Sequence, residues 1–380
     1  MTTALVKGNV LLYKGSSFLK QRLILSILSG KCVKINEIRA LDDEPGLREF
    51  EVSLIRLLDK ITNGTVVELN ETGTSLYFQP GLLYGGTTEH DCSLQRGIGY
   101  YLEALFILGL FCKQPINVTL RGVTSNNIDP SVDLMKTSMM QTLKKFVLDD
   151  DDLDLKIKKR GMRPLGGGEV VFKCPVRKQV RPIQFSESGM VKRIRGTAYA
   201  LRVSPAIANR MVDTAKGVLL KFIPDIFIST DQCKGKQTGK SPGFGIHLMA
   251  ETTTGVIYSA EQVSNVVTDG EELSIPEDLG VAAAQRLLYE IYLGGVTDST
   301  SQSLAIVNMA LGQKDVSKIV IGPLTDYSIG FLRHLKEFFG VTFKIEHYES
   351  DDENQTGTGS EKVLLTCVGI GYTNLSKRTI

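Results

Sequence analysis

The sequence is poor in aromatic residues: it contains no tryptophan, and tyrosine and phenylalanine together make up only 7% of the chain. Proteins that hold single-stranded nucleic acid by stacking place exposed rings against successive bases. With so few rings available, we expect any contact with RNA to run mainly through the phosphate backbone, which basic side chains bind.

Long hydrophobic runs are also missing from this chain of 380 residues. No stretch approaches the ~20 consecutive apolar residues that cross a membrane. The first eight residues lack the charged and then apolar pattern of a secretion signal. We therefore expect a soluble globular protein without a membrane partner, and a chain of this length is expected to form at least two domains.

Cysteine is present at six positions, but none of the pairs has the Cys-x-x-Cys spacing of a zinc site or redox motif. The six lie far apart in the sequence, which favours reduced intracellular thiols over a disulfide framework. We therefore predict no metal site and no cofactor. The positions are Cys32, Cys92, Cys112, Cys174, Cys233 and Cys367.

Charge is almost balanced over the whole chain, with a net charge of +2, but it is unevenly distributed. Residues 156–210 contain fourteen lysines and arginines and only two acids, Glu169 and Glu187, which is a surplus of twelve positive charges. The remainder of the chain therefore carries an excess of ten negative charges. Such asymmetry indicates a surface that binds a polyanion.

A run of three glycines lies at the start of this basic window. Gly166, Gly167 and Gly168 have no Cβ atom, so their backbone N–H groups can approach an anion closely. Arg160 and Arg163 precede them and add two planar guanidinium groups that suit phosphate oxygens. These five residues are a candidate anion or RNA site; the alternative is a glycine-rich hairpin between two strands.

The order helix, strand, helix and two strands occurs three times along the chain. An acidic residue marks the start of each second helix, at Glu44, Asp129 and Asp326, so the intervals are 85 and 197 residues. An insertion of roughly one hundred residues in the third unit explains the longer interval. We therefore predict an α+β protein. Its body has three repeated units, each with two helices on a four-stranded sheet, and a small α/β domain is inserted.

The predicted division places the first two units in residues 1–184, the insert in 185–280 and the third unit in 281–380. Helical spacing of apolar residues places a helix near Val281–Tyr292 in the third unit, before those at Gln302–Leu311 and Asp326–Phe339. Two flexible loops are expected, a cationic one at Lys234–Lys240 and an acidic one at Asp351–Ser360.

The glycine run resembles the signature of the RNA 3′-terminal phosphate cyclase family, Arg-Gly-x-x-Pro-x-Gly-Gly-Gly-x-Val, without a mismatch over Arg160–Val170. Later stretches are similar to the family's insert, namely Arg195–Tyr199, Arg202–Pro205, Ser241–Gly245 and Ala250–Thr252. The resemblance implies the body-plus-insert architecture. For the cyclases it also implies a reaction in which ATP adenylates a histidine and a terminal RNA phosphate is closed into a 2′,3′-cyclic phosphate.

Two departures predict that this chain is not a cyclase. The acidic residue and Gly-Gly-Gly-Gln motif near the cyclase N-terminus are replaced by Lys14-Gly15-Ser16-Ser17-Phe18. Counting along the helix that ends in Met309-Ala310-Leu311 places Thr300, or Ser299 with a one-residue gap, where the resemblance expects the histidine. Neither side chain gives a labile phosphoramidate, so we assign no catalytic residue.

Together with these departures, two further segments carry a resemblance to a eukaryotic, cyclase-like branch of the family. The segments are Gly85–Cys92 and Arg96–Glu103. That resemblance implies a nucleolar ribosome biogenesis factor for the small (40S) subunit. It implies early pre-rRNA processing towards 18S rRNA, and as partners pre-ribosomal RNA and a large GTPase of the small-subunit processome. The main hypothesis is a catalytically inactive homologue that binds RNA and this GTPase.

Two alternatives remain open, an endoribonuclease that cleaves pre-rRNA and a residual cyclase. For a nuclease, Asp298 with nearby acids is a weak candidate, and Arg333-His334-Leu335-Lys336 places a base beside two cations. The same four residues are also what the polar side of an amphipathic helix would show.

Specific contacts can be predicted for the binding hypothesis. Lys192, Arg193 and Arg195 are expected to contact RNA as part of the basic window. Arg333 and Lys336 are three residues apart on one helix, so they share a face and are expected to bind the GTPase. The apolar residues of that helix should turn inward: Ile329, Leu332, Leu335 and Phe339.

Overall fold

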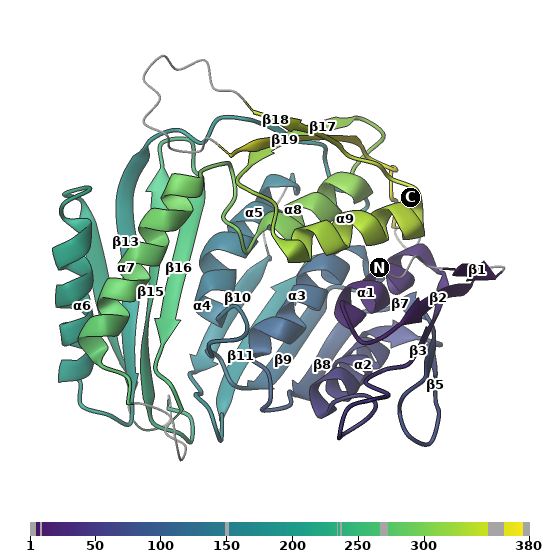
Figure 1. The fold of residues 1–380 in the computed structure, drawn as a ribbon, viewed down its shortest axis with the longest axis horizontal. Coiled ribbons are helices and arrows are strands. Elements are labelled where there is room, and N and C mark those ends of the chain that lie inside the picture. Colours follow the sequence, from purple (N-terminus) through teal and green to yellow (C-terminus); the bar gives the residue numbers. More distant parts are fainter. Residues whose placement is uncertain are drawn as a thin grey trace.

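The computed structural model describes residues 5–7, 10–148, 152–233, 235, 238–266, 273–348 and 361–374. Helices and mixed sheets alternate along these residues, which confirms the predicted α+β class (Figure 1). The acidic loop expected at 351–360 and part of the cationic loop at 234–240 lie outside the described residues.

The first unit is a five-stranded sheet with two helices. Its strand order is β1-β2-β3-β6-β5, formed by β1 (Leu5–Lys7), β2 (Val10–Lys14), β3 (Cys32–Asn36), β5 (Val66–Leu69) and β6 (Leu76–Gln79). The helices are α1 (Leu19–Ser29) and α2 (Glu49–Ile61). In α2 the fully buried residues follow the i, i+3, i+4, i+7 pattern that burial of one helix face requires: Leu54, Leu57, Leu58 and Ile61.

The second unit has the strand order β10-β11-β9-β8. The strands are β8 (Gly86–Asp91), β9 (Ile116–Gly122), β10 (Asp154–Lys159) and β11 (Gly168–Cys174). A short pair, β4 (Thr62–Asn63) with β7 (Leu82–Leu83), precedes them. After α3 (Ile98–Leu108) and η1 (Gly109–Phe111), the second helix of the unit is divided into α4 (Val132–Leu134), a π-helical turn η2 (Met135–Met139) and α5 (Met140–Lys145).

The third unit has the strand order β12-β17-β19-β18, with β12 (Gln184–Phe185), β17 (Val316–Ile321), β18 (Lys344–His347) and β19 (Val363–Val368). Its helices are α8 (Gln302–Leu311) and α9 (Asp326–Phe339). The strand β12 precedes the insert in sequence but pairs in parallel with β17. The chain therefore enters the third sheet once before the insert and again after it.

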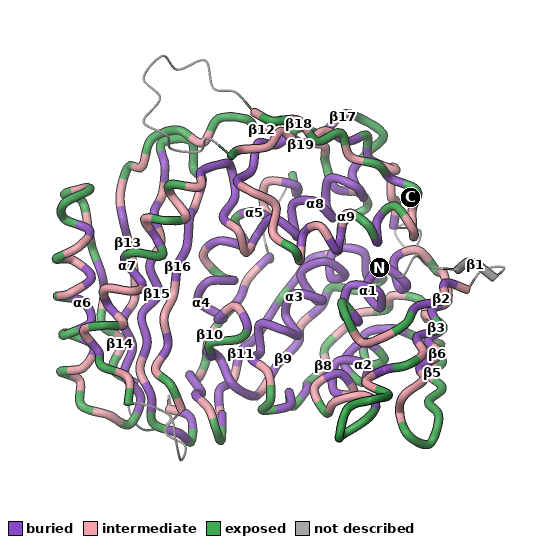
Figure 2. The backbone as a smooth tube through the Cα atoms, viewed as in Figure 1, coloured by how far each residue is buried: buried purple, intermediate pink, exposed green. Residues whose placement is uncertain are grey.

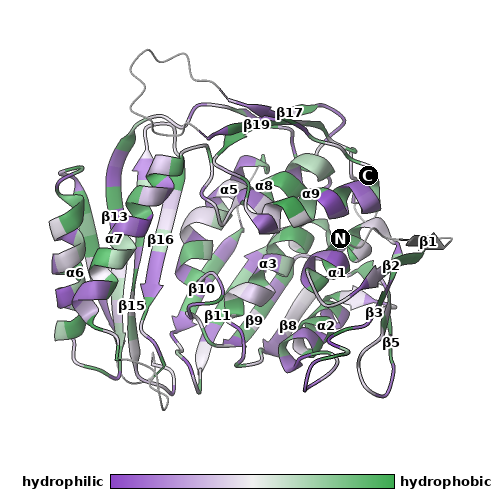
Figure 3. Cartoon of the chain, in the orientation of Figure 1, coloured by the Kyte–Doolittle hydropathy of each residue, from purple (hydrophilic) through white to green (hydrophobic). Residues whose placement is uncertain are grey.

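The helices of all three units meet in the middle of the molecule. Contacts join α1 to α3 and α9, and α8 to α3, α5 and α9. Every residue of α8 is buried. The centre of the molecule is largely purple, for buried, in Figure 2, and its helices include many hydrophobic residues, drawn green in Figure 3. The three sheets therefore share one helical core.

The insert is a four-stranded sheet covered by two helices. The strand order is β14-β13-β15-β16, with β13 (Val191–Leu201), β14 (Ile226–Cys233), β15 (Gly243–Thr252) and β16 (Ile257–Val263). The helices α6 (Ala206–Leu219) and α7 (Pro276–Leu293) pack together on the outer face (Figure 1). On the inner side, β16 contacts α4 and η2 of the second unit.

The placement of α7 differs from the sequence-based prediction, which assigned this helix to the third unit. In the structure α7 packs on α6, β15 and β16. Small residues make that approach close: a Cβ on Gly280 would lie 2.5 Å from the carbonyl oxygen of Met211. The apolar spacing of a helix shows that it has a buried face, but it does not show which sheet that face covers. We propose that the insert ends after Leu293.

Candidate nucleic-acid interface

The three glycines form a junction where several chain segments approach closely. Gly168 begins β11 and pairs with Gly122 of β9. A Cβ on Gly168 would lie 2.6 Å from Cγ2 of Thr124, and one on Gly166 would lie 2.8 Å from Cδ2 of Leu94. Such distances are below any normal contact, so only glycine fits here.

The insert lies directly against the same run. A Cβ on Gly167 would meet the backbone nitrogen and Cγ of Lys240 at 3.0 Å. The N–H of Leu165 donates to Oγ of Ser241 at 2.9 Å, and the N–H of Gly166 donates to the carbonyl of Met162 at 2.8 Å. The structure thus gives the run a packing function that the sequence analysis did not assign, and anion binding by the run stays a prediction.

Arg160 is buried and its guanidinium group binds carboxylates. Nη2 donates to Oδ1 of Asp133 at 2.9 Å and Nε donates to Oδ2 of Asp231 at 2.8 Å, while the group lies 4.7 Å from the ring centre of Tyr199. Burial alone would lower the pKa of Arg160, but the two carboxylates raise it above its ordinary value. These N–H donors bind Asp133 and Asp231 of the protein itself, whereas the sequence suggested that they would bind a phosphate.

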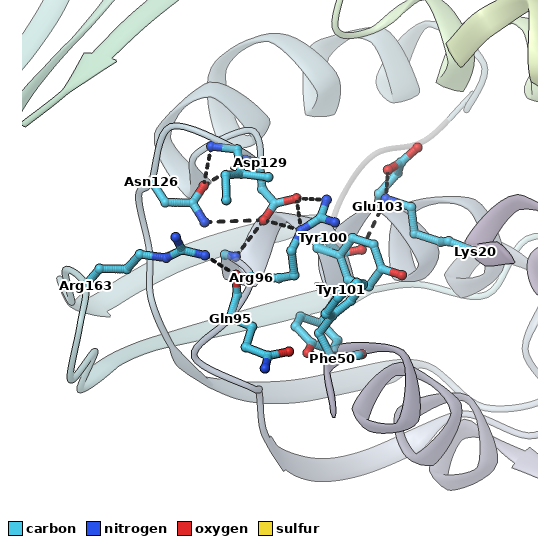
Figure 4. A network of polar contacts seen from close by, with 12 residues as sticks. Lys20, Phe50, Gln95, Arg96, Tyr100, Tyr101, Glu103, Asn126, Asp129 and Arg163 are labelled. Carbon is cyan, nitrogen blue, oxygen red and sulfur yellow. Dashed lines mark hydrogen bonds and ion pairs between the residues drawn. The ribbon is translucent and has the colours of Figure 1, made fainter. Parts of the chain in front are cut away.

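Arg163 belongs to a polar network at the entrance to α3 (Figure 4). Its Nη2 donates to the carbonyl of Gln95, and its Nε is buried without a hydrogen-bond partner among the described residues. Arg163 also lines a hollow of about 230 Å³ beside Asn126 and Pro242. Of the two predicted arginines, it is the one that retains an unpaired donor.

Arg96 and Asp129 form the centre of this network, and the sequence analysis assigned neither of them to a site. Nε of Arg96 donates to both carboxylate oxygens of Asp129 at 2.9 Å, and Asp129 also accepts from the N–H of Gly97 at 2.7 Å. The guanidinium group lies 4.4 Å from the ring centre of Tyr100. The ion pair and the acceptor for the N–H of Gly97 hold the loop that Arg163 contacts. The sequence signals here were the helix marker at Asp129 and the segment Arg96–Glu103.

The three cations predicted on β13 differ in their availability. Arg193 pairs with Glu251 of β15 at 2.6 Å, and Arg195 pairs with Asp225 at 2.8 Å. Lys192 is exposed. Two of the three are therefore at least partly neutralised by acids that lie outside the basic window in sequence, and Lys192 is the cation most open to RNA.

In α9, Arg333 and Lys336 are both exposed on one face. The helix begins at the side chain of Thr325, whose Oγ1 accepts from the N–H of Ser328 at 3.1 Å, and it ends at Gly340 with φ 73°. The buried stripe is slightly rotated from the expected one. Leu335 is fully buried as predicted, and Phe331 and Phe338 are buried with it. Of the other predicted residues, Leu332 and Phe339 pack partly buried against the core and Ile329 is half-buried. The rotation leaves both cations in solvent.

A cavity of about 440 Å³ lies between the second unit and the insert. Asp129 and Pro130 line it from the body, Glu261 and Arg286 from the insert, and Thr300 from the turn before α8. Burial raises the pKa of Glu261 to about 7. Ser299 does not line this cavity; its N–H and Oγ both donate to Oε2 of Glu290 at 3.0 Å.

Comparison with known proteins shows the family of this chain. The model of the family "RNA 3′-terminal phosphate cyclase" matches residues 11–345. The chain belongs to the RNA 3′-terminal phosphate cyclase family. It is 59% identical over 371 residues to the Homo sapiens "RNA 3′-terminal phosphate cyclase-like protein", with 98% of each chain covered.

Two further relatives in this family show the same full-length similarity. The Drosophila melanogaster "Probable RNA 3′-terminal phosphate cyclase-like protein" is 59% identical over 378 residues, 98% of each chain. The "rRNA processing protein rcl1" of Schizosaccharomyces pombe is 43% identical over 374 residues, which cover 98% of this chain and 99% of the relative.

Family cyclase chemistry needs an accessible histidine, and three of the four histidines here are buried and hydrogen-bonded. His90 bonds Ser53 at 2.9 Å, His247 bonds Thr137 at 3.1 Å, and His334 bonds Gln21 at 2.9 Å. Burial lowers the pKa of each, to about 4, 4 and 3 respectively. His334 therefore packs in the core beneath Arg333, and it does not form a site with Lys336.

The motif at the N-terminus of the family's cyclases is also altered in this structure. Lys14, which replaces the acidic residue, forms an exposed ion pair with Glu37 at 2.6 Å. Among the described residues, no cluster of histidine, cysteine, aspartate and glutamate could hold a metal ion. None of the described helices is long and apolar enough to cross a membrane.

Proposed function

We propose that this protein is a ribosome biogenesis factor that acts in rRNA processing. The observation that carries the proposal is the similarity to the Schizosaccharomyces pombe rRNA processing protein, which extends over 98% of this chain and 99% of the relative. Because the match is not confined to one unit, the similarity to this relative includes both the body and the insert. The finer assignment is early processing of pre-rRNA towards 18S rRNA of the 40S subunit, in the nucleolus.

In this role the protein binds pre-ribosomal RNA and does not close terminal phosphates. Lys192 is exposed, and the half-buried Arg163 lines a hollow, so both cations support backbone binding. The buried histidines and the pairing of Ser299 with Glu290 support the loss of the adenylation step.

The proposed protein partner is a large GTPase of the small-subunit processome. The exposed pair Arg333 and Lys336 on α9 supports a docking site for an acidic segment of that partner, because their helix is held rigidly against α1 and α8. Charged groups fixed on a rigid helix favour fast and specific association.

Complementation tests the proposed function. This chain should restore pre-rRNA processing in Schizosaccharomyces pombe cells depleted of their rRNA processing protein, measured by hybridisation to precursors of the 18S region. Accumulation of precursors although the chain is expressed and stable would contradict the proposal. If the purified chain alone cuts a pre-rRNA fragment, the endoribonuclease hypothesis would replace the binding hypothesis.

A further inference from the structure

A second cleft, of about 580 Å³, lies between the body and the insert, where Arg160 binds Asp133 and Asp231. Its walls are two edge strands, β10 of the second unit and β14 of the insert, and η2 contributes Lys136. Arg160, which lines the cleft, also forms an isolated β-bridge with Thr238. The floor carries Thr197 and His247.

The charges in this cleft are unevenly compensated. Its two carboxylates, Asp133 and Asp231, both bind Arg160. Within the part of the chain that the structure describes, Lys136 and Lys159 have no ion-pair partner, and Lys158 lies 3.2 Å from Glu169. His247 is buried and its pKa is lowered to about 4, so it adds no charge at neutral pH. The cleft is therefore positive.

The residues that line the cleft favour a polyanion. Lys136 of η2 and Lys158 and Lys159 of β10 all line it, so the second unit supplies three cations to one concave surface. A concave surface with one sign of charge and walls of low dielectric concentrates the potential inside it. The insert adds the hydroxyl groups of Thr197, Ser229 and Thr230 to the same lining. Hydroxyl groups can bond the 2′-hydroxyl that distinguishes RNA from DNA.

We propose that the cleft between β10 and β14 binds the phosphate backbone of single-stranded RNA through Lys136, Lys158 and Lys159. This site rests on the proposed role in rRNA processing and gives that role a contact surface at the junction of body and insert. The sequence analysis did not select it, because Lys136 lies outside the basic window and its neighbours in the cleft come from distant strands.

Binding of the full chain to a fluorescent oligouridylate of ~12 nucleotides tests the site. The double variant K136E/K159E should bind at least ~10-fold more weakly at physiological salt. Because two phosphate contacts are lost, the slope of log affinity against log salt should become less negative by about 1.4. The control K34E/K318E makes the same charge change at exposed lysines of β3 and β17 and should bind within about twofold of wild type.

Three results would overturn the proposal. The first is an equal loss of RNA affinity in the cleft variant and the control variant. The second is unchanged RNA affinity of K136E/K159E. Either result would leave wild-type RNA binding and the complementation result as separate tests of the proposed function. The third is that K136E/K159E keeps RNA affinity but loses affinity for an oligo-aspartate peptide, which would assign the cleft to an acidic protein segment. Cross-linking of 4-thiouridine RNA to peptides of β10 and β14 in the wild-type chain supplies a test that needs no variant.

Discussion

Arg160 joins the two parts of the molecule through one side chain. It binds Asp133 of α4 in the body and Asp231 of β14 in the insert, and its guanidinium group stacks against Tyr199 of β13. Burial would raise the pKa of Asp133, but Arg160 holds it below its ordinary value. A cation that seemed suited to phosphate thus organises the boundary between domains.

Replacement of Arg160 by alanine should destabilise the protein by ~3–5 kcal/mol, because it leaves the buried carboxylate of Asp133 without its cation. Urea denaturation at pH 7 measures the change, and Lys159→Ala at the neighbouring, partly exposed position is the control. Normal stability of Arg160→Ala combined with lost RNA binding would return Arg160 to a phosphate-binding role.

Glu261 makes the stability depend on pH in the opposite sense to an ordinary paired carboxylate. Oε1 accepts from the N–H of Ser131 at 2.8 Å, whereas Oε2 has no partner among the described residues. Because the folded pKa is raised to about 7, the folded state keeps a proton that the unfolded chain releases. The stabilisation is full below the unfolded pKa and is lost as pH rises towards 7.

Glu261→Gln should therefore be more stable relative to wild type at pH 8 than at pH 5, by at most roughly 3 kcal/mol. Chemical denaturation at both pH values measures the difference, and the exposed Glu68→Gln is the matched control. A difference that does not change with pH would show that Glu261 is ionised in the folded state.

At the scale of elements, the glycine run shows how β9, β11 and the insert are brought together. Gly168 lets β11 pair with β9 while Thr124 packs over it, and Gly167 lets the segment at Lys240 lie against the turn. The run is thus required by the approach of three backbones, and each glycine meets a different neighbour.

Two glycine-to-alanine changes should have opposite effects. Gly168→Ala should destabilise the protein by ~1–3 kcal/mol, because its Cβ would lie 2.6 Å from Thr124 Cγ2 and 2.9 Å from the carbonyl oxygen of Gly122. Gly217→Ala in α6 meets nothing within 4 Å and should stabilise by ~0.5–1 kcal/mol. Thermal denaturation compares the two; a tolerated Gly168→Ala would refute the packing function.

The α9 helix offers a test of the proposed GTPase contact. Arg333→Ala should weaken capture of the GTPase by at least ~10-fold, because an interfacial cation is lost while the buried side of the helix is untouched. The measurement is the affinity of the variant for the purified partner. The melting temperature checks that the variant is folded, and Lys318→Ala is the control. Normal GTPase binding with lost RNA cleavage would assign the helix to a nuclease site.

At the scale of the whole molecule, three sheets enclose one set of helices and the insert is attached to the second unit. The contacts of α8 with α3, α5 and α9 tie the third unit to the second, and those of α1 with α3 and α9 tie the first to both. Among the described residues, the 440 Å³ cavity and the 580 Å³ cleft both lie between this body and the insert.

Cyclase activity should be absent from this molecule. With ATP, magnesium and RNA that ends in a 3′-phosphate, no covalent AMP–protein adduct and no cyclic phosphate end should form, because the buried histidines are neutral and bonded to protein groups. Radiolabelled ATP detects the adduct, and a cyclase of the same family that retains its histidine is the positive control. Labelled AMP on this chain would overturn the prediction.

The sequence by itself determined the α+β class, the repeated order of helices and strands, and the insertion in the third unit. These features depend on local spacing: the apolar positions of α2, for example, have helical period wherever the helix later packs. The relation to the cyclase family was equally accessible, because the glycine signature is contiguous.

Only the tertiary structure decided which charges are available and where α7 belongs. Arginines that look unopposed between residues 156 and 210 form ion pairs with acids from distant helices, strands and loops: Arg160 with Asp133 and Asp231, Arg193 with Glu251, Arg195 with Asp225, and Arg210 with Glu277. Ion pairing depends on the distance between the two charges in space. Water and salt screen the attraction between exposed charges that lie more than a few ångströms apart. A count along the chain therefore cannot separate a lysine open to RNA from an arginine already held by the protein.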